Sequence, residues 1–112
     1  MKKIEAIIRP DRLPTVRRAI EEAGYPGMTI TNVYGHGTQK GIVEQYKGTK
    51  YTVDILPKVK IEIVVADEAA PRLVKTLVEA ARTGQIGDGK VFVSTIDDAI
   101  RVRTGESGKT AL

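Results

Sequence analysis

The sequence predicts a single α+β domain in which a four-stranded antiparallel sheet carries two helices on one face. Two segments support most of this prediction. Residues 58–66 alternate between apolar and charged side chains, which is typical of a strand with one buried face. Residues 73–81 repeat apolar side chains at helical spacing, which is typical of a helix packed on a sheet. The length of 112 residues leaves room for one domain, taken as residues 1–112.

The other elements follow from the same periodicities and from turn residues. One helix begins at Pro10 and ends before Gly24, and the second is expected to have Asp67 as its cap and to end before Gly84. The predicted strands cover residues 3–9, 28–34, 58–66 and 91–94. The order strand, helix, strand, strand, helix, strand is that of a ferredoxin-like βαββαβ fold.

A long segment, residues 37–56, separates the second predicted strand from the third, although a short turn would join them. Loops of this length without a core of their own are uncommon in compact domains and are usually functional. We therefore predict a mobile loop at about residues 37–56. An extended β-hairpin arm is the alternative structure for this segment.

Composition and charge exclude several classes of protein. Without cysteine, the chain forms no disulfide, thiolate metal site or cysteine nucleophile. The single histidine, His36, has no companion ligands, and no pair of nucleophile and base can be assembled, so an enzyme is not expected. The net charge of +4 favours an anionic partner, which phosphorylated small molecules, nucleic acids and acidic proteins all satisfy.

Targeting signals are also absent from the sequence. The first apolar run ends at Ile8, which is too short for a signal peptide. No stretch approaches the roughly 20 apolar residues that a membrane-spanning helix needs. A cytoplasmic protein is therefore expected.

The strongest local signal for chemistry is the glycine-rich turn at residues 83–90. Glycines allow backbone N–H groups to approach a phosphate, and Lys90 adds a positive charge. The spacing from Gly84 to Lys90 matches a P-loop, but Val91 replaces the hydroxyl that would hold magnesium, and the turn runs from helix to strand. We therefore predict an anion-binding turn that is not a P-loop.

Two arginines near the C-terminus, Arg101 and Arg103, form a second candidate for anion binding. In an extended segment their side chains share one face, and their forked guanidinium groups suit phosphates. An ordinary solvated edge strand is the alternative. Residues 105–110 resemble the end of a P-loop, but Arg103 stands where the first glycine is required. We therefore expect a polar, frayed tail at about residues 104–112.

Two motifs, YKGTKY at residues 46–51 and TGQIGDGKVFV at residues 83–93, resemble the PII nitrogen-regulatory family of signal-transduction proteins. The segments KKIEAIIRP and PKVKIEIVV are also similar to the family, so the likeness covers nearly the whole chain. It implies a homotrimer of ferredoxin-like subunits that is not an enzyme and that binds ATP or ADP in each cleft between neighbours. It further implies Mg²⁺, and 2-oxoglutarate as an effector.

The resemblance implies three sets of site residues. The expected nucleotide-binding residues are Thr29, Gly35, Gly37, Thr38, Gln39, Val64, Gly87, Asp88, Gly89, Lys90, Phe92, Arg101 and Arg103. The expected 2-oxoglutarate contacts are Gln39, Lys40, Gly41, Lys58 and Gly87, and Gln39 also holds Mg²⁺ together with the ATP phosphates. The expected partner contacts are Glu44, Lys47 and Tyr51, of which Tyr51 matches a position that is uridylylated in some members.

The implied mechanism is a population shift of the long loop. Residues 87–90 bind phosphates from one subunit, Arg101 and Arg103 reach in from the next, and Lys58 pairs with a carboxylate of 2-oxoglutarate. ATP with 2-oxoglutarate favours one loop conformation and ADP another. Only one conformation engages the partner, such as an ammonium transporter, which recruits the protein to the membrane, or an enzyme of nitrogen metabolism. No nucleic-acid partner and no direct membrane insertion are implied.

Several positions depart from the family pattern. Thr38 stands where many members carry a basic residue near the phosphates, which leaves the preference between ATP and ADP open. Lys47 replaces an arginine that often enters the channel pore, and the two are not geometrically equivalent. Thr49 and Lys50 differ from the usual small and acidic residues, which leaves recognition by the modifying enzyme open.

Two other functions fit the same order of elements. An RNA-binding module of the RRM type would need stacking aromatic residues, but the third strand offers Lys60, Glu62 and Val64 instead. A small phosphate-handling enzyme would use Lys90 with the two arginines, but it needs a catalytic constellation that the sequence lacks.

Overall fold

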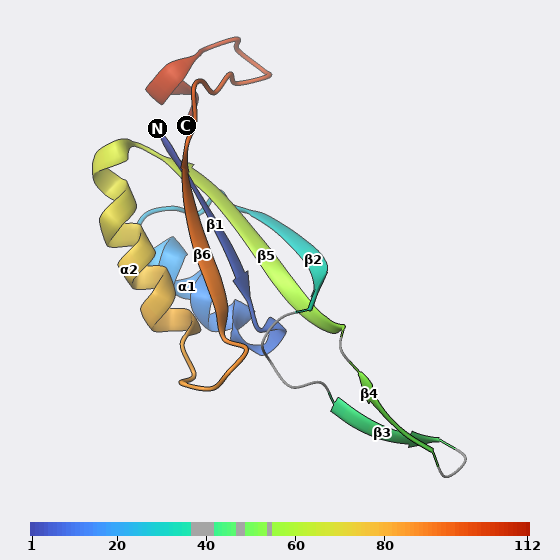
Figure 1. Cartoon of the computed structure of the whole chain (residues 1–112). Coiled ribbons are helices and arrows are strands. Elements are labelled where there is room, and N and C mark those ends of the chain that lie inside the picture. The colour runs from blue at the N-terminus through green and yellow to red at the C-terminus, as the bar shows by residue number, and fades with distance from the viewer. Residues whose placement is uncertain (37–41, 47–48, 54) are drawn as a thin grey trace.

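The computed structural model describes residues 1–36, 42–46, 49–53 and 55–112 (Figure 1). The four strands of the main sheet are β1 (Lys2–Ile8), β2 (Thr29–Gly35), β5 (Leu56–Val65) and β6 (Gly89–Thr95). The helices are α1 (Leu13–Glu22) and α2 (Ala70–Ala81). Short 3-10 turns cover Pro10–Arg12, Asp67–Ala69 and Gly108–Ala111. None of the helices in these ranges is long and apolar enough to cross a membrane.

The sheet has the strand order β2-β5-β1-β6, and every neighbouring pair is antiparallel. Strand β1 lies inside the sheet, so that Ile4 faces Ile63 of β5 on one side and Val93 of β6 on the other. Both helices pack on the same face of the sheet (Figure 1). The predicted ferredoxin-like fold is therefore confirmed.

The hydrophobic core lies between the sheet and the two helices. Strands β1 and β5 each contribute every second residue, as their alternating sequences predict. The buried apolar residues are Ile4, Ala6, Ile8, Val16, Ile20, Val59, Ile61, Ile63, Val65, Ala70, Leu73, Leu77 and Ala81. Each large aliphatic side chain among them contributes about 1.5 to 3 kcal/mol by leaving water.

The opposite face of the sheet carries charged side chains. Lys3 of β1 forms an ion pair with Glu62 of β5 at 3.1 Å, and Lys60 approaches the same carboxylate at 3.5 Å. Because both helices pack on the other face, this face is open in the single chain. We call it the open face.

The insertion between β2 and β5 contains a β-hairpin. Strands β3 (Ile42–Tyr46) and β4 (Thr49–Val53) pair antiparallel, with Ile42 opposite Val53 and Tyr46 opposite Thr49. The hairpin projects away from the end of the main sheet (Figure 1). Paired strands thus occupy part of the segment predicted as a loop, because strand pairing satisfies main-chain groups that an unpaired loop leaves to water.

Asp67 does not cap the second helix, which corrects the prediction. It opens the 3-10 turn before α2, and the first helical position follows Ala69, which forms no side-chain cap. The Asp67 carboxylate instead forms an ion pair with the amino group of Met1 at 2.8 Å. The hydrogen bond from this amino group lowers the pKa of Asp67. The carboxylate is therefore engaged by Met1 and not by the N-terminal end of α2.

The tail after β6 is neither extended nor frayed, which corrects two further predictions. The N–H of Gly105 donates to the carbonyl of Arg101 at 2.8 Å, so the chain turns where an extended segment was expected. Ile100 pairs with Ser107, and Lys109 forms an ion pair with Glu68 at 3.3 Å. The positive φ of Gly105, +73°, permits this turn at a position where other residues are strained.

Substitution of Gly89 by alanine is expected to destabilise the domain. Gly89 has a φ of +103°, and a Cβ atom there would lie 1.7 Å from the carbonyl oxygen of Ile7. Backbone strain and the clash together predict a loss of about 2 to 4 kcal/mol in the free energy of unfolding. Urea unfolding at fixed protein concentration measures this loss.

Gly24→Ala is the matched control. Gly24 has a φ of +98°, but nothing lies within 4 Å of the position that a Cβ atom would take there. The substitution therefore tests the backbone penalty alone, about 1 kcal/mol. Equal losses for the two variants would contradict the argument that the close approach to β1 requires glycine at position 89.

Candidate anion-binding site

The glycine-rich turn between α2 and β6 is organised by Asp88. One carboxylate oxygen accepts hydrogen bonds from the backbone N–H groups of Thr83 at 2.8 Å and Gly84 at 2.9 Å. The other accepts a short hydrogen bond from the Thr83 hydroxyl. The carboxylate thus faces the donors of its own turn.

Arg9, just after β1, connects this turn to the sheet. Its Nε donates to Asp88 Oδ1 at 3.0 Å, and its Nη2 donates to the carbonyl of Ile86 at 2.6 Å. Hydrogen bonds from Thr83 above all, and also from Arg9 and Gly84, hold the pKa of Asp88 well below its usual range. The carboxylate is therefore charged and internally paired at neutral pH.

Lys58 of β5 reaches the same turn from the interior of the sheet. Its ammonium group donates to the carbonyl of Gly87 at 2.8 Å. Burial, and to a smaller extent the charge of Arg9, lowers the pKa of Lys58 below its usual value. Gly35 lies against this side chain, since a Cβ at position 35 would stand 3.1 Å from Lys58 Cγ.

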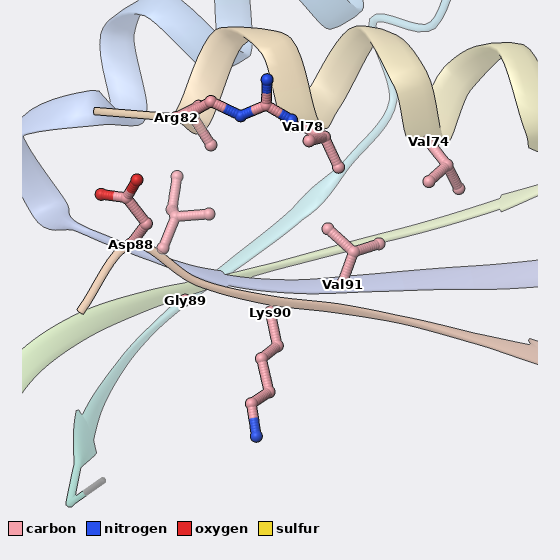
Figure 2. Close-up of a pocket in the computed structure, with 9 residues that line it drawn as sticks. Val74, Val78, Arg82, Asp88, Gly89, Lys90 and Val91 are labelled. Atoms are coloured by element: carbon pink, nitrogen blue, oxygen red, sulfur yellow. The ribbon is translucent and has the colours of Figure 1, made fainter. Parts of the chain in front are cut away.

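Lys90 lies on the open face of the sheet. Figure 2 shows its side chain pointing away from α2, whereas that of Val91 points toward the helix. Lys90 and Lys60 both pair in register with Ile7, so the two lysines flank it on this face. Together with Lys58, they create a positive potential at the end of the open face where the glycine-rich turn lies.

A groove of about 370 Å³ lies on the other side of β6, beneath α2 (Figure 2). Its walls are mainly apolar and include Val74, Val78 and Val91. The Lys90 side chain points away from this space. Asp88, Gly89 and Lys90 border this groove as well as the glycine-rich turn, but the groove lies on the helix side of the sheet and not on the open face.

The structure divides the described nucleotide-site candidates between two ends of the sheet (Figure 1). Near the glycine-rich turn lie Gly35, Gly87, Asp88, Gly89 and Lys90, together with the 2-oxoglutarate candidate Lys58. Toward the other end lie Val64, Arg101 and Arg103, and between the two groups Thr29 and Phe92 share one row of the register across the sheet. Thr29 and Gly35 begin and end β2, a separation of about 20 Å in an extended strand.

The two arginines do not share an extended segment. Arg101 donates to Glu106 at 3.5 Å and to the carbonyl of Leu112 at 3.2 Å, within the tail. Arg103 lies in the adjacent turn and is exposed. One chain thus brings neither arginine to the glycine-rich turn.

The other candidates fall in or near the insertion. Gly37, Thr38, Gln39, Lys40, Gly41 and Lys47 lie outside the described residues. Glu44 of β3 and Tyr51 of β4 are paired in the backbone register of the hairpin. Among the described residues, no group of three His, Cys, Asp or Glu side chains is placed to hold a metal ion.

Sequence reasoning missed Arg9, although it contacts the candidate site directly. The register pairs Ile8 with Gly89, so the next residue of the chain after β1 lies beside Asp88. This neighbourhood follows from the strand order and is not visible in a local motif.

The low pKa of Asp88 predicts a pH dependence of stability. Because the folded-state pKa lies below the ordinary value of about 3.9, the carboxylate stabilises the fold above that value and loses this effect as the pH falls toward the folded-state pKa. Asp88→Asn should therefore lower the unfolding free energy at neutral pH and flatten its decline below about pH 4. Urea unfolding between neutral and acidic pH, with Asp97→Asn as the control, checks this. Equal acid slopes for wild type and Asp88→Asn would contradict it.

Comparisons with known proteins agree with the motifs. The family model for nitrogen regulatory protein P-II matches residues 1–106. The chain is 56% identical over 112 residues to the nitrogen regulatory protein P-II 2 of Methanothermobacter thermautotrophicus, covering 100% of this chain and 97% of the relative. It is 55% identical over 112 residues to the nitrogen regulatory protein P-II of Bradyrhizobium diazoefficiens and 52% identical over 112 residues to that of Haemophilus influenzae. Each of these two matches covers 100% of this chain and 100% of the relative.

These names describe regulatory proteins, which agrees with the prediction that the chain is not an enzyme. They also favour a regulatory protein over the RNA-binding module and the small phosphate-handling enzyme. The match spans both sequence motifs and all the elements of the main sheet. The chain belongs to the P-II family of nitrogen regulatory proteins.

Proposed function

We propose that this P-II protein senses ATP, ADP and 2-oxoglutarate and controls a partner protein through residues 37–56. One observation carries this proposal. The nucleotide-site candidates of the glycine-rich turn and those of the tail, including Arg101, lie at opposite ends of the sheet. A nucleotide that contacts both groups must lie between two copies of the chain.

A closed ring of copies satisfies this requirement. When one end of a subunit contacts the other end of its neighbour, the interface is heterologous, and such contacts close into a ring if the rotation permits. The open face supplies charged and apolar surface for the contact, including the pair of Lys3 and Glu62. We propose the homotrimer that the family resemblance implies.

The glycine-rich turn and Lys90 would hold the nucleotide phosphates. Lys90 supplies positive charge, and the glycines permit close approach of the main chain. The arginines of the neighbour would add forked donors to the same phosphates. The internal pairing of Asp88 with Arg9 reduces the repulsion that its carboxylate would otherwise exert on an anion.

The effector site would share this end of the open face. Lys58, whose ammonium group donates to the carbonyl of Gly87, would pair with a carboxylate of 2-oxoglutarate. The described residues offer no cluster of metal-binding side chains, so Mg²⁺ would take its ligands from Gln39, the ATP phosphates and 2-oxoglutarate. The cation would offset the repulsion between the triphosphate and the dicarboxylate.

The output would be a change in the population of loop conformations. The β3–β4 hairpin projects from the same end of the sheet, so ligands bound there lie next to its base (Figure 1). A cytoplasmic P-II protein of this kind would recognise an ammonium transporter or an enzyme of nitrogen metabolism, with Glu44, Lys47 and Tyr51 as the proposed contacts.

Calorimetric titration tests the ligands. We expect 2-oxoglutarate to bind when ATP and Mg²⁺ are present and to bind at least about tenfold more weakly with ADP or without nucleotide, because the cation bridge is then incomplete. Lys58→Ala should abolish the effector signal and retain ADP binding. Equal affinity for 2-oxoglutarate with and without ATP and Mg²⁺ would contradict the shared site.

Mixed oligomers test the location of the nucleotide between subunits. Lys90→Ala damages the turn and Arg101→Ala damages the tail, so each homo-oligomer should lose nucleotide affinity. In a refolded equimolar mixture, about one quarter of the clefts combine an intact turn with an intact tail by random assembly. Filter-binding of labelled ADP should recover this fraction. The absence of recovery, together with a monomeric mass by light scattering, would contradict the proposal.

A further inference from the structure

Arg9 joins two points of the glycine-rich turn. Its Nε binds the carboxylate of Asp88 at 3.0 Å and its Nη2 binds the carbonyl of Ile86 at 2.6 Å. Only 22% of the Arg9 side chain is exposed, and 24% of that of Asp88. This forked contact holds the turn with a defined orientation, which a single point charge does not provide.

The two hydrogen bonds hold the segment that presents the main chain of Gly87 and Gly89. Ile86 precedes Gly87, and Asp88 separates the two glycines. Arg9 therefore binds the main-chain carbonyl before Gly87 and the carboxylate between Gly87 and Gly89. Both glycines have positive φ, +97° and +103°, which a mobile glycine segment would not hold without such anchors.

Arg9 also balances a charge. The Asp88 carboxylate lies inside the proposed phosphate-binding turn, where an unpaired negative charge would repel the ligand. The ion pair with Arg9 cancels much of this charge. The same positive charge acts on Lys58, which binds the neighbouring carbonyl of Gly87.

We propose that Arg9 is a positioning residue for anion binding in this protein. It holds the glycine-rich turn in its binding geometry and neutralises Asp88, with two of its nitrogen atoms committed to the turn. This inference rests on the proposed nucleotide site, and it assigns a role to a residue outside the three sets of site candidates.

Arg12 provides a matched control within the same segment. Its Nε and Nη2 both donate to the carbonyl of Ala80, at 3.2 and 2.6 Å. It therefore anchors the C-terminal end of α2 through the same two donor atoms and the same number of hydrogen bonds as Arg9, but onto a neutral carbonyl and not onto a carboxylate. Both of these hydrogen bonds of Arg12 go to α2 and not to the glycine-rich turn.

The test compares Arg9→Gln, Arg9→Lys and Arg12→Gln in the full chain. Thermal unfolding measures the structural cost, and calorimetric titration with ADP measures affinity. We expect Tm to decrease in both glutamine variants, but ADP affinity to fall by about tenfold in Arg9→Gln alone, as for a lost charged hydrogen bond. Arg9→Lys should recover part of the affinity, because it restores the charge without the fork.

The double variant Arg9→Gln/Asp88→Asn separates positioning from stability. Removing both charges leaves no unpaired carboxylate, so ADP affinity should rise above that of Arg9→Gln, while Tm stays low. A purely structural role predicts no such recovery. ADP affinity that falls equally in Arg9→Gln and Arg12→Gln, or that does not recover in the double variant, overturns this inference alone. No ADP binding by the unsubstituted chain overturns the proposed function and this inference with it.

Discussion

The antiparallel pairing of β1 with both β5 and β6 is the constraint on which the rest of the structure depends. It places the buried face of β1 against the helices and brings the ends of three strands together. Through this register Arg9 meets Asp88, and Lys58 meets Gly87. The candidate site is thus a consequence of strand pairing, and a shift of one residue would turn its side chains to the other face.

The turn between α2 and β6 shows how a carboxylate can reside in a site suited to anions. Asp88 accepts hydrogen bonds from the N–H groups of Thr83 and Gly84 in the turn after α2, and Arg9 offsets its charge. The lysines of the open face then determine the sign of the local potential. Order within the turn and attraction of an anion are compatible because the negative charge is paired internally.

The small size of the domain and the division of its site candidates have a common consequence. A chain of 112 residues leaves one face of its sheet open, because two helices cover only the other. The groups around Lys90 and Arg101 lie at opposite ends of the sheet and cannot act on one small ligand within a single chain. Assembly would cover the open face and complete the proposed site with the same contact.

Local sequence patterns determined much of the fold. The alternation in β5 and the helical stripe of α2 identified these elements, because each period reports which side of an element meets the core. Gly24 marked the end of the first helix, whereas Pro10 opens the 3-10 turn that precedes it and α1 itself begins at Leu13, three residues later than predicted. The glycine-rich turn and the family motifs were equally visible, because they are short and contiguous.

The tertiary structure decided what depends on residues far apart in the chain. The sequence predicts Asp67 as a helix cap, but in the folded chain its carboxylate forms an ion pair with the amino group of Met1. In the turned tail, the N–H of Gly108 donates to the carboxylate of Asp98, and Lys109 forms an ion pair with Glu68. Arg9 gained its role only when β1 and β6 became neighbours. Local preferences determine which elements form, whereas the partner of a charged side chain is the group that folding brings within reach.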